Sequence, residues 1–119
     1  MEPPEEKALI EEERATLAAK GWDVSTDVHM VEGKTQWGVA DVIAEMGNTI
    51  ICVECKYINR TNPTKKRKKV KDQAIYYASW MKCRNPNKSV GAAIHTNEER
   101  RILCEVEYKE SYQRLKSLG

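Results

Sequence analysis

The stretch VADVIAEMGNTIICVECK, residues 39–56, decides the fold of this chain. It holds two short runs of strand-forming residues, 39–45 and 49–56, which are separated by Gly47-Asn48. Glycine followed by asparagine is a strong signal for a two-residue hairpin turn, because both residues tolerate the left-handed backbone that such a turn needs. The sequence therefore predicts an antiparallel hairpin at the centre of the chain.

This turn also determines which residues of the hairpin face each other. Paired positions have numbers that add up to 95, so Asp41 lies opposite Glu54 with the Cβ atoms ~5 Å apart. Lys56 follows Glu54 by two residues and lies on the same face of its strand. Like charges opposite each other destabilise a sheet, so the pair needs a compensating partner. Mg²⁺, which prefers hard oxygen ligands, would be such a partner.

A second interpretation of the same three residues stays open. Asp41, Glu54 and Lys56 could form an exposed cross-strand salt bridge without any chemical role. A bulge or a longer loop would also shift the register of the hairpin and separate the two carboxylates.

The segments around the hairpin predict a mixed α/β fold. Leu9, Ile10 and Leu17 have helical spacing, and Gly21 ends that segment. In chain order the sequence predicts a helix over 4–20, a strand over 22–30, the hairpin, a loop over 60–66, a helix over 68–82, strands over 89–94 and 102–108, and a terminal helix from residue 110. This order is typical of one domain, residues 1–119, with a central mixed sheet flanked by helices.

Composition narrows the class of protein. With 119 residues, 40% of them hydrophobic, the chain suffices for one small core, and its apolar runs are far shorter than the ~20 residues of a membrane helix. Four cysteines do not make a disulfide-dense pattern, so we expect a cytoplasmic, intracellular protein with reduced thiols. Cys52 and Cys55 point to opposite faces of one strand, which argues against a zinc site.

Basic residues are concentrated in one third of the chain. Residues 56–88 carry eleven bases and one acid, although the net charge of the whole chain is only +2. Six of these bases gather within seven residues: Lys65, Lys66, Arg67, Lys68, Lys69 and Lys71. Such a run predicts salt-sensitive, sequence-independent binding to nucleic-acid phosphates. A solvated lysine-rich loop and a nuclear localisation signal remain alternatives. Because few aromatic residues interleave with the bases, duplex backbone contact is favoured over base stacking.

These features together resemble the PD-(D/E)xK nuclease superfamily. Residues 39–41 (Val-Ala-Asp) and 51–56 (Ile-Cys-Val-Glu-Cys-Lys) are similar to its Asp…Glu-x-Lys signature, with Ala40 in place of the usual proline. The amino-acid sequences of residues 38–41, 53–57 and 91–96 are similar to those of the Mrr-type and archaeal Holliday-junction-resolvase branches. The resemblance covers roughly residues 5–96 and implies a restriction-endonuclease-like core in α-β-β-β-α-β order.

The resemblance also implies roles for individual residues. Asp41 and Glu54 would be ligands of Mg²⁺ or Mn²⁺, together with the backbone carbonyl of Cys55, whose side chain would point into the core. Lys56 would be the catalytic lysine, which orients the attacking water or neutralises charge on the phosphate.

The helices of the family contribute further residues. Many members use a glutamine and a tyrosine on the helix after the hairpin, and Gln73 and Tyr77 match them here. We assign Gln73 to the site, whereas Tyr77 fits the hydrophobic core better. A glutamate of the first helix often joins as well, and the resemblance does not choose between Glu6 and Glu13. His95 is read as a strand histidine with a hydrogen-bond partner.

The sequence therefore predicts a metal-dependent DNA endonuclease that recognises DNA structure or depends on a partner subunit. One site per chain and two strands per duplex favour a homodimer. Two alternatives remain: a nucleic-acid-binding module that does not cleave, and an interaction protein in which the charged residues are only a salt-bridge cluster.

Overall fold

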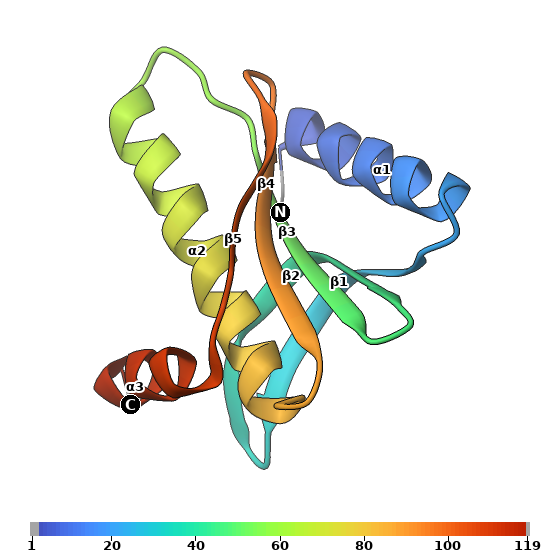
Figure 1. The fold of residues 1–119 in the computed structure, drawn as a ribbon. Coiled ribbons are helices and arrows are strands. Elements are labelled where there is room, and N and C mark those ends of the chain that lie inside the picture. The colour runs from blue at the N-terminus through green and yellow to red at the C-terminus, as the bar shows by residue number, and fades with distance from the viewer. Residues whose placement is uncertain (1–2, 119) are drawn as a thin grey trace.

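The computed structural model describes residues 3–118 as three helices and five strands. In chain order these are α1 (Pro4–Ala19), β1 (Asp23–Glu32), β2 (Thr35–Met46), β3 (Thr49–Lys56), α2 (Pro63–Arg84), β4 (Ser89–Thr96), β5 (Arg100–Glu105) and α3 (Tyr108–Leu118). The strands form one sheet in the order β1-β2-β3-β4-β5, in which β3 and β4 are parallel and the other neighbours antiparallel (Figure 1). The predicted mixed α/β fold is confirmed.

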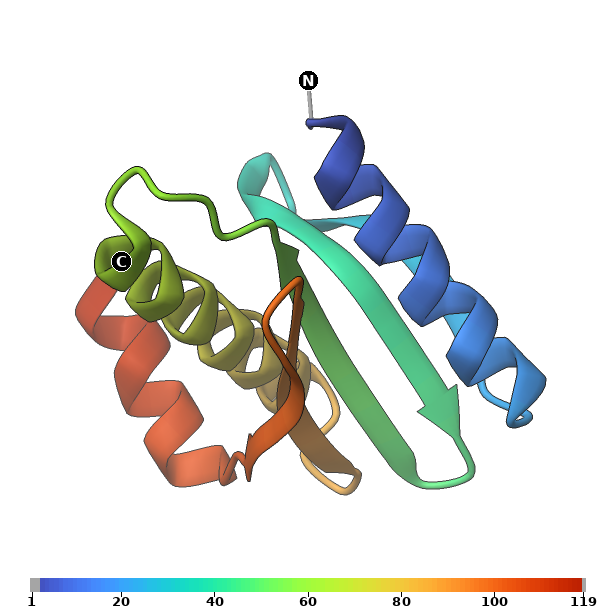
Figure 2. The same cartoon turned by 90° about the horizontal axis from the view of Figure 1, so that it is seen from above.

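Helices cover both faces of the sheet and create two separate cores. α1 packs against one face, while α2 packs against the other with α3 beside it (Figure 2). Alternate residues of β3 serve the two cores: Cys52 packs with the α2 side, whereas Val53 and Cys55 pack with α1. Within residues 3–118, none of the helices is long and apolar enough to cross a membrane.

The central hairpin has the predicted register, and the boundaries elsewhere differ in one important place. The pairs from Val42–Val53 to Met46–Thr49 all add up to 95, as a Gly47-Asn48 turn requires. The predicted loop over 60–66 is wrong from Pro63 onward, because α2 begins there. Proline suits the first helical position, where its missing N–H has no partner to lose. The basic run therefore lies entirely on a helix and does not begin in a loop.

Candidate active site and nucleic-acid interface

Asp41 and Glu54 lie opposite each other at the open end of the hairpin. Beyond the Val42–Val53 pair, side chains replace the regular ladder. The Asp41 backbone N–H donates to Oε1 of Glu54 at 3.0 Å, and the Cys55 N–H donates to Oδ2 of Asp41 at 2.9 Å. Each carboxylate is thus held by the backbone of the neighbouring strand, in the facing arrangement that the register predicts.

The two carboxylates lie in a protected and negatively charged environment. Glu54 is 5% exposed and Asp41 is half-buried. Burial raises the pKa of the Asp41 carboxyl above its ordinary value, and the charges of Glu6 and Asp27 raise this pKa further. A hydrogen bond shared with the Glu54 carboxyl and the bond from the Cys55 amide oppose that rise. A bound cation would stabilise the ionised form of this group.

The structure distinguishes the two glutamates that the sequence left open. Glu6, in the first turn of α1, places Oε1 3.1 Å from Nζ of Lys56. Glu13 is instead buried away from this pair, and both of its oxygens accept hydrogen bonds from Arg100 at 2.7 Å. Nδ1 of His95 lies 2.8 Å from Glu13, so the expected partner of this histidine is found. Glu6 therefore joins the candidate site.

Asp27 is a nearby acid that the sequence analysis missed. The pairs Thr26–Val42 and Val28–Ala40 place it opposite Asp41 on β1, where its left-handed φ of 51° leaves it out of the regular pairing. Next to the turn between β1 and β2, the residue numbers of paired positions add up to 67. An irregularity between Met30 and Val31 shifts this sum to 68 for the rest of the two strands. No local sequence signal marked that shift, so the position of Asp27 was not predictable.

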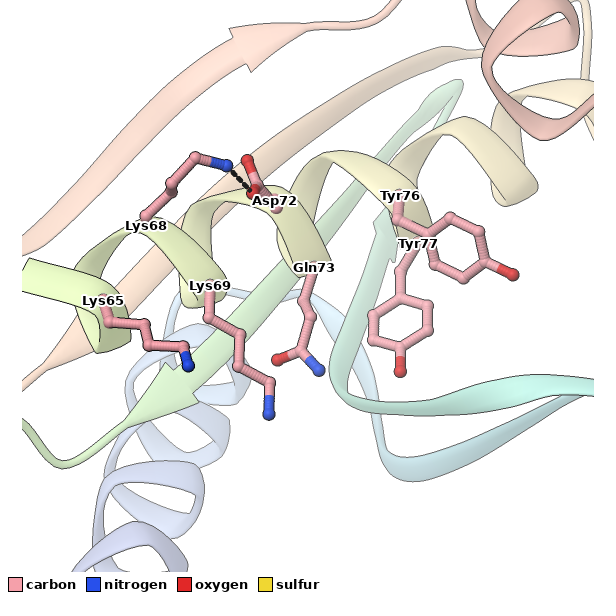
Figure 3. A pocket seen from close by; sticks show the side chains of 7 residues that line it. All are labelled: Lys65, Lys68, Lys69, Asp72, Gln73, Tyr76 and Tyr77. Carbon is pink, nitrogen blue, oxygen red and sulfur yellow. Dashed lines mark hydrogen bonds and ion pairs between the residues drawn. The ribbon is translucent and has the colours of Figure 1, made fainter. Parts of the chain in front are cut away.

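A groove along α2 lies next to the hairpin. It is a hollow of about 510 Å³ lined by Lys65, Lys68, Lys69, Asp72, Gln73, Tyr76 and Tyr77. Figure 3 shows Lys65, Lys69 and Gln73 extending from one side of the helix, while Lys68 pairs with Asp72 at 2.6 Å. The groove therefore combines cations at its N-terminal end with polar and aromatic groups further along α2.

The six clustered bases do not all lie in this groove, because a helix distributes a continuous run over all of its faces. Arg67 makes two hydrogen bonds to Glu98, at 2.8 and 2.7 Å, and Lys66 donates to the Asn59 side chain. Lys71 does not line the groove either. Half of the predicted phosphate-binding set is thus gathered at one place.

Tyr77 connects the α2 groove with the hairpin. It is 8% exposed and belongs to the core on the α2 side, as predicted. Burial raises the pKa of its phenol, and the negative charge of Glu54 acts in the same direction, followed by that of Asp41. The ring lies against Gly38, where a Cβ atom would come within 2.7 Å of the phenol oxygen. Gly38 therefore allows Tyr77 to border the carboxylate pair.

The cysteines and the carboxylates differ in what they could bind. Cys52 and Cys55 occupy opposite faces of the sheet, as expected, and burial raises the pKa of the Cys52 thiol, which disfavours a metal-binding thiolate. Among residues 3–118, no group of three or more histidines, cysteines and acids is arranged to hold a metal ion. A magnesium site needs only one or two carboxylates, since waters and substrate phosphates complete its shell.

Comparisons with known proteins do not assign a family. No family model matches the chain, and a search of curated proteins finds no match. The resemblance to the PD-(D/E)xK nucleases therefore stays a prediction that depends on the residues and geometry described above.

Proposed function

We propose that this protein is a Mg²⁺- or Mn²⁺-dependent DNA endonuclease that hydrolyses phosphodiester bonds in a structure-directed manner. The observation that carries the proposal is the end of the hairpin. Two carboxylates face each other there beside Lys56. Tyr77, which lines the basic groove of α2, borders these carboxylates.

The donor set of this site suits a divalent cation. Asp41 and Glu54 provide two carboxylates, and Lys56 with its partner Glu6 lies close to them. Their oxygens are hard donors, and a carboxylate oxygen that accepts one N–H keeps lone pairs for a metal. Asp41 and Glu54 would hold the ion, with the Cys55 backbone carbonyl as a further ligand. When bound, the ion would neutralise phosphate charge and acidify a water molecule.

The chain's own residues would position the substrate. Lys56, oriented by Glu6, would donate hydrogen bonds to the attacked phosphate or to the attacking water. Lys65, Lys68 and Lys69 would bind the flanking phosphates without reading sequence. Gln73, in the same groove, would contact the DNA next to the cut. Such contacts would select the shape of the DNA rather than its sequence. We expect the nuclease to be intracellular.

A two-fold dimer would serve both strands of a duplex, and we include it in the proposal. The edge strand β5 exposes Ile102 by 69%, so this strand is a candidate for the dimer surface. Light scattering at micromolar concentration, with and without DNA, measures the assembly; a monomer in both conditions contradicts the dimer.

The decisive experiment is a cleavage panel of plasmid, single strand, flap and four-way junction in Mg²⁺ or Mn²⁺. We expect cleavage of at least one branched substrate by the wild type and none by Glu54→Gln. In parallel, Mg²⁺ or Mn²⁺ should raise the Tm of the wild type but not of Asp41→Asn. Absence of both effects would contradict a metal-dependent enzyme.

A second candidate is a nucleic-acid-binding module that keeps this arrangement but does not cleave. One observation favours it: Asp41 and Glu54 each accept a backbone N–H, which is also what purely structural carboxylates do. DNA binding with a steep salt dependence, without cleavage or metal-induced stabilisation, would support this alternative.

A further inference from the structure

A second hollow lies at the other end of α2, between that helix, α3 and the beginning of β2. It measures about 460 Å³ and is lined by Glu32, Trp37, Trp80, Cys83, Arg84, Tyr108, Tyr112, Leu115 and Lys116. Its four aromatic rings come from three separate elements of the chain. A cavity of this size with mostly apolar and aromatic walls is typical of a small-ligand site.

Two tyrosine rings of this aromatic pocket are exposed to solvent. Tyr108 and Tyr112 are 45% and 50% exposed, and their rings are nearly parallel, with 22° between the planes and 6.4 Å between the centroids. The Arg84 guanidinium lies over Trp80, 4.7 Å from the ring centroid, which orders another flat cation–π pair. Such surfaces bind planar rings by stacking.

The polar groups of the pocket indicate what kind of planar ring fits. Arg84 and Lys116 outnumber Glu32, so the rim attracts a ligand that carries negative charge. A nucleobase with its phosphate combines a planar ring with a negative charge.

The aromatic pocket continues the α2 groove. Tyr76 lines the groove, and its hydroxyl donates to the backbone carbonyl of Trp37, which lines the pocket, at 3.2 Å. Lys69 and Trp80 are eleven residues apart on one helix, which is roughly 16 Å or about five base steps. A strand whose phosphates contact the lysines therefore reaches the pocket within a few nucleotides.

We propose that the aromatic pocket binds an unpaired nucleobase of the DNA that occupies the α2 groove. This inference rests on the proposed function and refines its substrate class to DNA with unpaired nucleotides close to the cut. A paired base cannot enter, because its faces are stacked within the duplex. The pocket would thus discriminate branched or flapped DNA from plain duplex through stacking and not through base identity.

The test measures binding in EDTA, so that neither metal nor cleavage is needed. The probes are a plain duplex and the same duplex with a three-nucleotide flap that carries 2-aminopurine. We expect the wild type to quench the 2-aminopurine and to bind the flap on the order of 10-fold more tightly than the duplex. Y108A/Y112A should abolish the quenching and the preference, with duplex affinity changed less than about 2-fold.

Met46→Ala is the matched control, because Met46 is 44% exposed and lies at the hairpin turn, outside the pocket. It should retain the quenching and the preference. Equal affinities in the wild type, or an undiminished preference in the double variant, would overturn the inference. So would a change in oligomeric state of the double variant with its preference intact, because the pocket would then be a protein contact.

Failure of this inference is distinguishable from failure of the proposed function. A retained flap preference in a protein that does not cleave supports the pocket and contradicts the nuclease. Cleavage without any flap preference would support the nuclease and contradict the pocket. No binding to either probe would contradict both.

Discussion

Two glutamates on the same helix, Glu6 and Glu13, have opposite environments in this molecule. Glu13 is 1% exposed, and both of its oxygens are bound by Arg100, with His95 beside them. Glu6 is closer to solvent and reaches Lys56, in a region that already contains Asp41 and Glu54. Both oxygens of Glu13 are thus paired within the Glu13 cluster, which also contains Arg100 and His95. The hairpin cluster, formed by Asp41, Glu54, Glu6 and Lys56, has an excess of acids.

This difference is the reason why we propose a function for the hairpin cluster and a structural role for the Glu13 cluster. A buried carboxylate that is fully paired locks α1 onto β4 and β5 and needs nothing from outside. Burial raises the pKa of Asp41, neighbouring carboxylates raise it further, and a bound cation would stabilise its ionised form. We therefore expect substitutions in the hairpin cluster to change chemistry and those in the Glu13 cluster to change stability.

The largest expected effect is on cleavage by Glu54→Gln. Glutamine keeps the shape of Glu54 but removes the charge that would hold the ion, so the rate should fall on the order of 10³-fold or more. DNA affinity should be unchanged or slightly higher, because a negative charge near the phosphates is lost. Single-turnover cleavage and equilibrium binding measure the two effects.

Lys56→Ala and Glu105→Gln are the controls for this result. Lys56→Ala should slow cleavage similarly but keep the metal-induced rise in Tm, because lysine is not a ligand. Glu105 is exposed on β5, so its substitution should change neither quantity. Equal cleavage by the wild type and Glu54→Gln would contradict the assignment of the hairpin cluster.

The second prediction is that a substitution in the Glu13 cluster changes stability but not cleavage. Glu13→Gln should lower the free energy of unfolding by about 2–4 kcal/mol, because it removes the charged partner of Arg100 from a buried site. Cleavage well below the Tm should stay close to the wild-type rate. Denaturant unfolding and cleavage assays at low temperature measure both.

Glu6→Gln is the matched substitution on the same helix. It should change the free energy of unfolding by only ~0–1 kcal/mol, as for a partly exposed ion pair. Its cleavage rate should fall roughly 10- to 100-fold, since Glu6 orients Lys56. If Glu6→Gln were the destabilising variant and Glu13→Gln the inactive one, this result would contradict the roles assigned to the two clusters.

The hairpin cluster was predictable from sequence because its determinants are local. The Gly47-Asn48 turn fixes the register, and the register places Asp41 opposite Glu54. The fold class followed from the order of the periodic segments. Glu6 and Glu13 were not separable, because both lie on the apolar face of α1 and only the tertiary packing decides their partners.

Features to which distant segments of the chain contribute were not predicted from the sequence. Asp27 reaches its position through a register shift after Met30 that no turn signal announces. The basic run looks free of aromatic neighbours in sequence, yet Trp37 and Tyr108 meet Trp80 of the same helix in space. A pattern limited to one segment cannot reveal such a combination.

The third prediction concerns the salt dependence of DNA binding and tests whether the groove lysines contact the phosphates. Six phosphate contacts would give a log–log slope of roughly −5 for binding to duplex DNA. K65A/K68A/K69A, which removes the three groove lysines, should flatten this slope by about 2–3 units. K66A/K71A removes bases outside the groove and should leave the slope nearly unchanged, within about 0.5 units for the two lysines together. Equal effects per lysine would contradict the groove as the binding surface.

The smallest expected effect is on the stability of the metal-free protein. Because burial and neighbouring acids raise the pKa of Asp41 in the folded state, folding opposes its ionisation. The stability contribution of the protonated group is therefore present at low pH. It is lost as pH rises from about 3.9, the ordinary aspartate value, through the raised folded pKa.

Asp41→Asn removes this loss, because asparagine stays neutral and can still accept the Cys55 N–H. In EDTA at neutral pH its Tm should exceed that of the wild type by a few degrees, and the difference should disappear at low pH. Mg²⁺ or Mn²⁺ should reverse the order, since only the wild type gains stability from the ion. Asp23→Asn, an exposed position on β1, should show neither effect. A lower Tm of Asp41→Asn in EDTA, together with an unchanged response to metal, would mean that Asp41 serves the strand pairing and not a cation. Thermal denaturation across pH, with and without the ion, therefore tests whether the hairpin cluster differs in kind from the cluster around Glu13, in which both carboxylate oxygens are already paired.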